Sequence, residues 1–353
     1  MAGKPTLLGG PVSTIEWTDE TWNPTTGCTK VSQGCKHCYA ETFAKRKLGA
    51  FADHASYNEG EDWAIERKFT DVRCHPERLD QPLRWKRPRM VFVNSMSDLF
   101  HEDVPADFIA QVWITMARTP QHTFQVLTKR PERMRRLLTS AEPLSDFSVL
   151  PDAVHEIEVL DRIEAGGGGT VEYRWPLPNV WLGVSVEDQA TADERIPILL
   201  DTPAAVRFVS YEPALGPVDF TDLTVANGEQ WNALDRYEAA DAEPGSPNTT
   251  LDWLIVGGES GPHARPFDIQ WARDTIRQCR EAGVPVFCKQ LGARPVYQIS
   301  THTPERDEPG RRHLWDHPHG YTLDLRDRNG RDMSEWPGHL RIREFPVGER
   351  SSD

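Results

Sequence analysis

The alternation of short apolar runs with amphipathic segments constrains the fold of this chain most strongly. The six runs are rich in β-branched and aromatic residues, and they are Met90–Asn94, Thr123–Leu127, Val180–Val184, Val206–Ser210, Trp253–Gly257 and Val284–Cys288. The segments with helical spacing are Asp107–Arg118, Pro131–Thr139, Asp188–Leu200 and Ile269–Ala282. Such alternation indicates a parallel sheet with helices packed outside it, and the continuous apolar character of the strands fits burial on both faces.

We therefore expect an α/β fold, a partial or complete (β/α) barrel over residues 1–295, followed by an irregular C-terminal extension over 296–353. A further strand or extended segment is expected near the cysteines described below. Polar stretches near residues 49–70, 141–178 and 221–250 interrupt the alternation and are predicted to be insertions. Because active sites of such barrels gather at the carboxyl ends of the strands, the polar residues that follow each run are the candidates for function.

Composition excludes several classes of protein. The chain has 40 Lys and Arg against 54 Asp and Glu, a formal charge of −14, which argues against broad non-specific binding to DNA. No stretch approaches ~18 apolar residues and the N-terminus lacks a signal-peptide pattern, so we expect a cytoplasmic protein that does not span a membrane. Three of the six cysteines lie within eleven residues. In a chain this long, such a cluster is more typical of a metal or redox site than of a disulfide scaffold.

The clustered cysteines are Cys28, Cys35 and Cys38, spaced C-x6-C-x2-C within the segment TGCTKVSQGCKHCYAE. A glycine directly before each of the first two cysteines allows tight turns, and Tyr39–Lys47 is predicted to form a helix. A [4Fe–4S] cluster held by four cysteines is closed and transfers electrons, whereas one held by three leaves an iron open to a ligand. If that ligand is S-adenosylmethionine, electron transfer from the cluster can generate a 5′-deoxyadenosyl radical.

Two other classes of protein remain open at this point. One is a non-catalytic, zinc-stabilised nucleic-acid-binding protein, with His37 or a distant residue as the fourth zinc ligand. The absence of a second C-x2-C or an H-x3-H pair makes zinc less favourable. The other is an electron carrier, which would need a fourth cluster ligand that the sequence does not obviously offer.

The resemblance to a known family is carried by the cysteine segment together with six further stretches. These are Ile15–Pro24, Phe92–His101, Val126–Met134, Trp181–Glu187, Phe208–Pro217 and Trp253–Pro266. Together they resemble a phage- and bacteria-associated family of radical S-adenosylmethionine-like proteins of unassigned function, which is distantly similar to spore photoproduct lyase. The resemblance implies a radical S-adenosylmethionine-type barrel, a lyase or transferase with a [4Fe–4S] cluster and S-adenosylmethionine as cofactors, and an electron donor such as a flavodoxin or ferredoxin.

Two departures from the usual pattern accompany the resemblance. The common motif of such enzymes separates its first two cysteines by three residues, and here six residues separate them. The usual Gly-Gly-Glu after the second strand is replaced by Asn94-Ser95-Met96-Ser97-Asp98. In the enzymes that this chain resembles, that Gly-Gly-Glu holds the methionyl amine of the cofactor. The Gly257-Gly258-Glu259 of this chain follows a much later strand, so we do not transfer that role to it.

Polar residues at the ends of successive predicted strands are the candidate cofactor ligands: Asn94, Ser95, Ser97, Asp98, Lys129, Ser185, Glu187, Glu212 and Glu259. Asp98 could accept hydrogen bonds from the cofactor ammonium or could cap the next helix. Lys129 could pair with the cofactor carboxylate, and Ser185 and Glu187 could hold the ribose hydroxyls. For the acidic residues, ordinary capping or salt bridging is the alternative. Arg130 and Arg133 belong either to the site or to a solvated helix face.

Substrate contacts are suggested by one thiol and two basic segments. Cys288 could return a hydrogen atom to a product radical, and its alternative is that of a small buried hydrophobe. The basic segments Arg84–Arg89 and Lys129–Arg136 could grip phosphates and stack on a base, or could merely solvate the barrel rim. We therefore expect a nucleic acid or nucleotide substrate, with a small or flipped-out target favoured by the acidic total charge.

Overall fold

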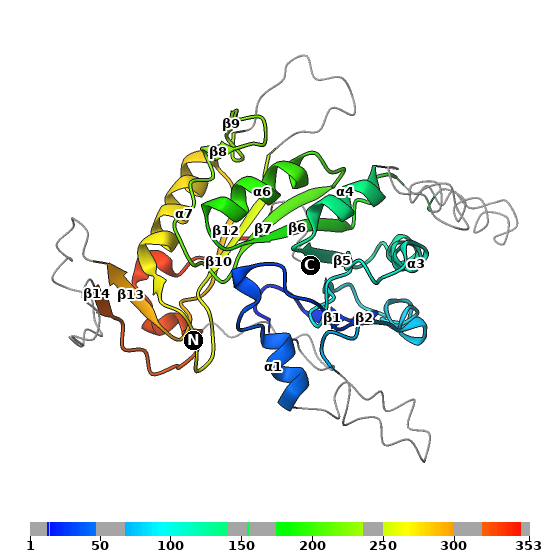
Figure 1. The fold of residues 1–353 in the computed structure, drawn as a ribbon, viewed down its shortest axis with the longest axis horizontal. Coiled ribbons are helices and arrows are strands. Elements are labelled where there is room, and N and C mark those ends of the chain that lie inside the picture. The colour runs from blue at the N-terminus through cyan, green and yellow to red at the C-terminus, as the bar shows by residue number, and fades with distance from the viewer. Residues whose placement is uncertain are drawn as a thin grey trace, which may run out of the picture.

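The computed structural model describes residues 15–46, 68–139, 174–235, 250–298 and 320–346, together with Ser13 and Val154. Within these residues seven parallel strands form a sheet that curls into a half-barrel (Figure 1). In spatial order the strands are β1 (Glu20–Trp22), β4 (Met90–Val93), β5 (Thr123–Thr128), β6 (Val180–Val186), β7 (Val206–Tyr211), β10 (Trp253–Gly257) and β12 (Val286–Gln290). The structure thus confirms the predicted α/β class and the partial form of the barrel.

Helices follow the strands as the sequence pattern predicts. They are α1 (Tyr39–Arg46), α3 (Ala106–Ala117), α4 (Pro131–Leu138), α6 (Gln189–Leu200) and α7 (Ile269–Ala282). Figure 1 shows α4, α6 and α7 along the outer side of the sheet. Local signals set their ends: the Asp188 carboxylate accepts from the Thr191 amide at 3.0 Å at the start of α6, and α7 ends at Gly283 with φ 69°. None of the described helices is long and apolar enough to cross a membrane.

The two faces of the sheet bury different residues. The outer face carries aliphatic side chains such as Val184 and Val256, which join the main core beneath the helices. The inner face is filled at its base by a largely aromatic cluster of Trp17, Phe92, Trp181, Phe208, Trp253, Ile255 and Phe287. Gly183 on the inner face leaves room for this cluster, because a Cβ there would lie 2.5 Å from the Phe208 ring. The half-barrel therefore has a closed apolar floor.

Smaller sheets and the C-terminal segment surround the half-barrel. Two-stranded sheets pair β2 (Thr25–Thr26) with β3 (Arg73–Cys74) and β8 (Leu223–Thr224) with β9 (Gln230–Trp231), and a third sheet holds β11 (Phe267–Asp268), β13 (Pro295–Gln298) and β14 (Gly320–Thr322). Short 3-10 turns occupy Gln33–Cys35, Pro76–Arg78, Pro82–Arg84, Met333–Glu335 and Gly338–Leu340. The predicted insertion at 221–250 begins with the β8–β9 hairpin, whereas most of those at 49–70 and 141–178 lie outside the described residues.

The described part of the C-terminal extension is tied into the core. The Cys288 amide donates to the Ile342 carbonyl at 2.9 Å and the Glu344 amide to the Val286 carbonyl at 3.0 Å, so this segment covers the edge of β12. Phe345 stacks on Trp253 with ring centroids 5.3 Å apart. Residues 342–345 therefore complete both the sheet edge and the apolar floor, where an irregular cover was expected.

Candidate functional site

Residues 27–38, hereafter the cysteine loop, lie across the carboxyl ends of the strands. The loop enters beside β4, where Gly27 forms a parallel bridge with Ser97 and the Ser97 hydroxyl donates to the Thr25 carbonyl at 2.9 Å. Gly27 has φ 91°, and a Cβ there would lie 2.4 Å from the Asp71 carbonyl oxygen. Only glycine fits this turn, as the sequence suggested.

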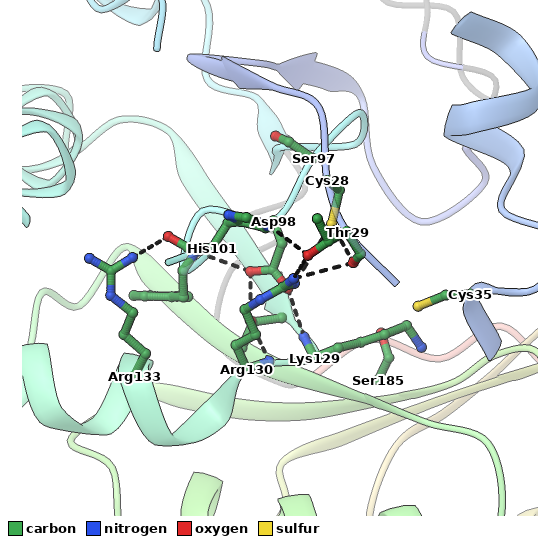
Figure 2. Close-up of polar contacts among 12 residues, drawn as sticks. Cys28, Thr29, Cys35, Ser97, Asp98, His101, Lys129, Arg130, Arg133 and Ser185 are labelled. Carbon is green, nitrogen blue, oxygen red and sulfur yellow. Dashed lines mark hydrogen bonds and ion pairs between the residues drawn. The ribbon is translucent and has the colours of Figure 1, made fainter. Parts of the chain in front are cut away.

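Arg130, at the end of β5, holds the first part of the loop. Its guanidinium donates to the Thr29 carbonyl at 3.2 Å and hydroxyl at 2.9 Å, and to the Cys28 sulfur at 3.7 Å (Figure 2). The hydroxyl of Thr29 also lies 2.7 Å from Nε2 of His101. Arg130 is only 7% exposed, so the alternative of a solvated helix face is wrong for this residue.

Both carboxylate oxygens of Asp98 accept hydrogen bonds from donors of the protein itself. Its carboxylate accepts from the Thr128 hydroxyl at 2.7 Å, from the amides of Phe100 and Lys129 at 3.0 Å each, and from Arg130 at 3.2 Å. The alternative of helix capping is wrong, because α3 begins at Ala106 after Pro105. Burial opposes the charge on Arg130, but Asp98 and Cys28 favour it and the pKa of the guanidinium is raised.

Glu187, at the end of β6, holds the middle of the loop. The carboxylate is 1% exposed and accepts from the Ser32 hydroxyl at 2.9 Å, from Arg195 at 3.2 Å and from the Lys129 ammonium. Gly34 of the loop packs directly on it, since a Cβ there would lie 2.3 Å from Oε1. The predicted partner of Lys129, a cofactor carboxylate, is thus replaced in this structure by a protein carboxylate.

Glu259, after β10, holds the end of the loop together with Arg265. The carboxylate accepts from the Arg265 side chain at 2.7 and 3.0 Å and lies 3.2 Å from Nδ1 of His37. Arg265 in turn donates to the Gln33 carbonyl at 2.9 Å. Although burial favours the neutral acid, the hydrogen bonds from Arg265 keep the pKa of Glu259 below its usual value.

Polar groups above the aromatic floor form the inner wall beneath the loop. Glu212 lies 3.2 Å from the Lys289 ammonium and accepts from the Ser210 hydroxyl at 3.4 Å. Gly257 makes room for this carboxylate, because a Cβ there would lie 2.6 Å from Oε1 of Glu212. Ser185, labelled in Figure 2, follows Val184 on β6, and Val184 is the register partner of Thr128, which precedes Lys129. The inner wall therefore offers hydroxyls, a carboxylate and ammonium groups.

Near β4, the remaining predicted residues bind the start of the loop. The Ser95 carbonyl accepts from the Tyr39 hydroxyl, and the Ser95 hydroxyl donates to Asn23 at 3.2 Å. Asn94 has φ 62° and its Oδ1 accepts from the Thr25 amide at 3.4 Å. Its buried Nδ2 has no hydrogen-bond partner among the described residues.

The three loop thiols are half-buried and none forms a disulfide. Burial raises the pKa of Cys28 to about 11 and also raises that of Cys38. Within the described residues no three His, Cys, Asp or Glu side chains are grouped to hold one metal ion. The three thiols therefore share one loop without forming a ready-made site for a single ion.

Cys288, the predicted hydrogen-atom donor, lies in the outer core and not beside the cysteine loop. Strand β12 runs Val286–Gln290, two residues later than predicted, so Cys288 is mid-strand. It is fully buried in the outer core, opposite Val256, and burial raises the pKa of its thiol to about 12. These surroundings match the alternative of a small buried hydrophobe.

The basic segments also lack the expected exposed cluster at the site. Arg84–Arg89 precedes β4 and therefore lies at the amino end of the sheet, opposite the cysteine loop. There Arg89 lies 2.6 Å from Glu20 and packs over Trp85. In the second segment Arg133 donates to the Val104 carbonyl at 2.8 Å, and Arg135 pairs with Asp201 at 2.6 Å.

Sequence reasoning missed Thr29, Ser32, His101 and Arg195. The hydroxyls and the histidine carry no distinctive pattern. Arg195 does carry one, because it interrupts the apolar stripe of α6 formed by Ala192, Ile196 and Leu199, and it is 2% exposed. A charge at a buried helical position implies a buried partner, which here is Glu187.

Comparison with known proteins gives one match. No curated protein and no solved structure matches the chain. A family model described as protein of unknown function DUF5131 matches residues 12–318, which include the cysteine loop and every strand of the half-barrel. The chain therefore belongs to the DUF5131 family.

Proposed function

We propose that this protein is a radical S-adenosylmethionine enzyme whose Cys28, Cys35 and Cys38 hold a [4Fe–4S] cluster. One observation carries the proposal: a loop with three half-buried thiols is fixed over the carboxyl ends of a parallel half-barrel by residues from three different strand ends. This is the edge at which barrel enzymes gather their active sites. A merely structural metal knuckle does not require such placement.

The donor set fits the cluster. Three soft sulfur ligands come from one short loop, and all three thiols are half-buried. A cluster tolerates wider spacing than a single ion because each thiolate binds a different iron. When bound, the cluster and S-adenosylmethionine would supply a 5′-deoxyadenosyl radical.

The chain's own residues would bind and orient the cofactor. Glu212 would accept hydrogen bonds from its ammonium group, since both oxygens of Asp98 are occupied. Lys289 and Lys129, whose side chains are each 19% exposed, would turn to its carboxylate. Ser185 and Ser210 would hold hydroxyls, and the aromatic floor would exclude water from below.

The substrate and the electron donor enter at the loop face. Lys36 is exposed beside the cysteines, as is Lys30, which pairs with Glu41 at 3.0 Å, and Lys36 would meet an acidic one-electron donor such as a flavodoxin or ferredoxin. We do not extend the proposal to a nucleic-acid duplex. Of the two basic segments, one lies at the opposite end of the sheet and the other pairs with carboxylates and carbonyls of the protein.

The test is anaerobic reconstitution with iron and sulfide, followed by dithionite and S-adenosylmethionine and detection of 5′-deoxyadenosine by mass spectrometry. We expect the native protein to bind iron and to form the product. Cys35→Ala should bind less iron and form less 5′-deoxyadenosine than the native protein. The matched control Cys74→Ala should bind iron and form the product like the native protein, because Cys74 lies in β3 outside the loop.

Metal analysis separates the competing function. Stoichiometric zinc in an otherwise colourless protein would refute the radical mechanism and favour a zinc-stabilised binding protein. A brown protein with four iron atoms per chain that neither binds S-adenosylmethionine nor forms the product would point instead to an electron carrier with a closed cluster.

A further inference from the structure

Arg130 is distinguished among the charged residues around the cysteine loop by its contact with sulfur. Its Nη1 donates to the Cys28 sulfur at 3.7 Å. Lys129 and Arg195 are directed to Glu187 instead. Arg265 reaches the loop, but it contacts the Gln33 carbonyl oxygen.

The guanidinium is held in this position from several sides. Asp98 accepts from Nη1 at 3.2 Å, the Thr29 carbonyl and hydroxyl accept from Nη2, and Glu102 accepts from Nε at 3.2 Å. The planar fork of an arginine is well suited to fixed contacts of this kind. Because Arg130 is 7% exposed, its charge acts on Cys28 with little screening by water.

We propose that Arg130 and Asp98 form a charge pair that sets the reduction potential of the cluster through Cys28. This inference rests on the proposed function, and it adds a role for two residues that do not bind the cluster. Each electron that enters the cluster makes the loop more negative. A buried cation beside one thiolate stabilises that reduced state, and a buried anion behind the cation opposes it.

Removing either member of the pair should shift the midpoint potential of the cluster, and the two shifts should have opposite signs. In Arg130→Met the cation is lost and Asp98 stays behind, so reduction becomes harder and the midpoint potential falls. In Asp98→Asn the cation is less compensated, so the midpoint potential rises. A purely structural role predicts something else, namely that both changes loosen the same corner and shift the potential in one direction.

The experiment is a dithionite titration of the reconstituted protein, monitored by electron paramagnetic resonance, without S-adenosylmethionine and without turnover. Arg130→Lys, which keeps the charge and loses the fork, should fall between native and Arg130→Met. Arg265→Met is the matched control, because it also removes an arginine contact to the loop but touches no sulfur. Its potential should equal the native one.

Shifts of opposite sign, with Arg265→Met unchanged, support the inference. Shifts of the same sign, no shift, or an equal shift in Arg265→Met overturn it. If Arg130→Met loses its iron, Asp98→Asn decides alone: a potential at or below the native value refutes the pair. If the native protein takes up zinc in place of iron, the proposed function and this inference are overturned together. If the native protein holds the cluster but neither Arg130→Met nor Asp98→Asn shifts its midpoint potential, the inference alone is overturned.

Discussion

The buried carboxylate of Glu187 should be costly to remove from this fold, because two cations depend on it. In Glu187→Gln the side-chain shape is kept, but the ammonium of Lys129 and the guanidinium of Arg195 lose their anion. Removing one partner of a buried ion pair costs about 3–5 kcal/mol. Arg195 is 2% exposed and cannot turn to water, whereas the Lys129 side chain is 19% exposed and can. The amide oxygen of Gln still accepts one bond. We therefore expect a loss of about 3 kcal/mol in the free energy of unfolding, near the lower end of that range.

The assay is urea unfolding of the metal-free, reduced protein, followed by tryptophan fluorescence and circular dichroism at pH 7. The stability change is taken from the midpoint at constant slope, because an altered slope would indicate a change in the unfolded state. Glu194→Gln is the matched control. Glu194 also faces Arg195, at 4.0 Å, but its side chain is 65% exposed, so its loss should cost below about 1 kcal/mol. A loss below about 1 kcal/mol in Glu187→Gln, or an equal loss in both variants, would refute the reasoning, given the magnitudes typical of buried and exposed pairs.

Three further predictions concern the loop, the base of the sheet and the core. Gly34→Ala should lower the iron content after reconstitution, because the added methyl meets a carboxylate oxygen at 2.3 Å, whereas Gly338→Ala, with nothing within 4 Å, should leave it unchanged. Burial holds the pKa of His122 below 6.5. The unfolded chain therefore binds a proton before the folded chain does, and the free energy of unfolding should fall as pH drops below about 6.5. In His122→Gln, urea titrations should show a weaker dependence of this free energy on pH, and an unchanged dependence would contradict the assignment. The Cys288 thiol, with its pKa raised to about 12, should resist alkylation by iodoacetamide at pH 8 in the native protein. Half-buried Cys74 should be alkylated faster, and peptide mass spectrometry measures both rates. Comparable rates would show that the core opens readily.

The fold followed from periodicity because its strands are buried on both faces. All six apolar runs became strands, and only Val284–Cys288 was misplaced, by two residues. There the αL residue Gly283 ends α7 and the following residues complete the turn before β12. Residues 342–345 were not recognised as part of the sheet edge and floor, since a short polar segment with one aromatic residue gives no periodic signal. Their place is set by pairing with β12 and by stacking on Trp253.

For the site, the sequence predicted which residues would gather but not what they would touch. Of the polar residues at strand ends, Glu187 and Glu259 contact the cysteine loop, whereas Asp98 and Lys129 contact residues that hold it. Their partners could not be predicted, because a carboxylate at a strand end suits a cofactor, a cation or a backbone amide equally well. The decisive information is three-dimensional: Asp98 has both oxygens occupied by protein donors, and Lys129 faces Glu187. Gly34 was assigned to a flexible turn, and its structural requirement is instead the space taken by Glu187.

The contacts of the cysteine loop also impose an order of assembly on the chain. The loop leaves the ribosome early, yet the residues that fix it are synthesised much later: Arg130 follows Thr29 by 101 positions, Glu187 follows Ser32 by 155 and Arg265 follows Gln33 by 232. Such long-range contacts form slowly, because the intervening chain must first be ordered. The three cysteines are therefore exposed on a nascent chain until β10 has joined the sheet. Delivery of iron and sulfide is best timed after translation, when the binding loop has its final shape.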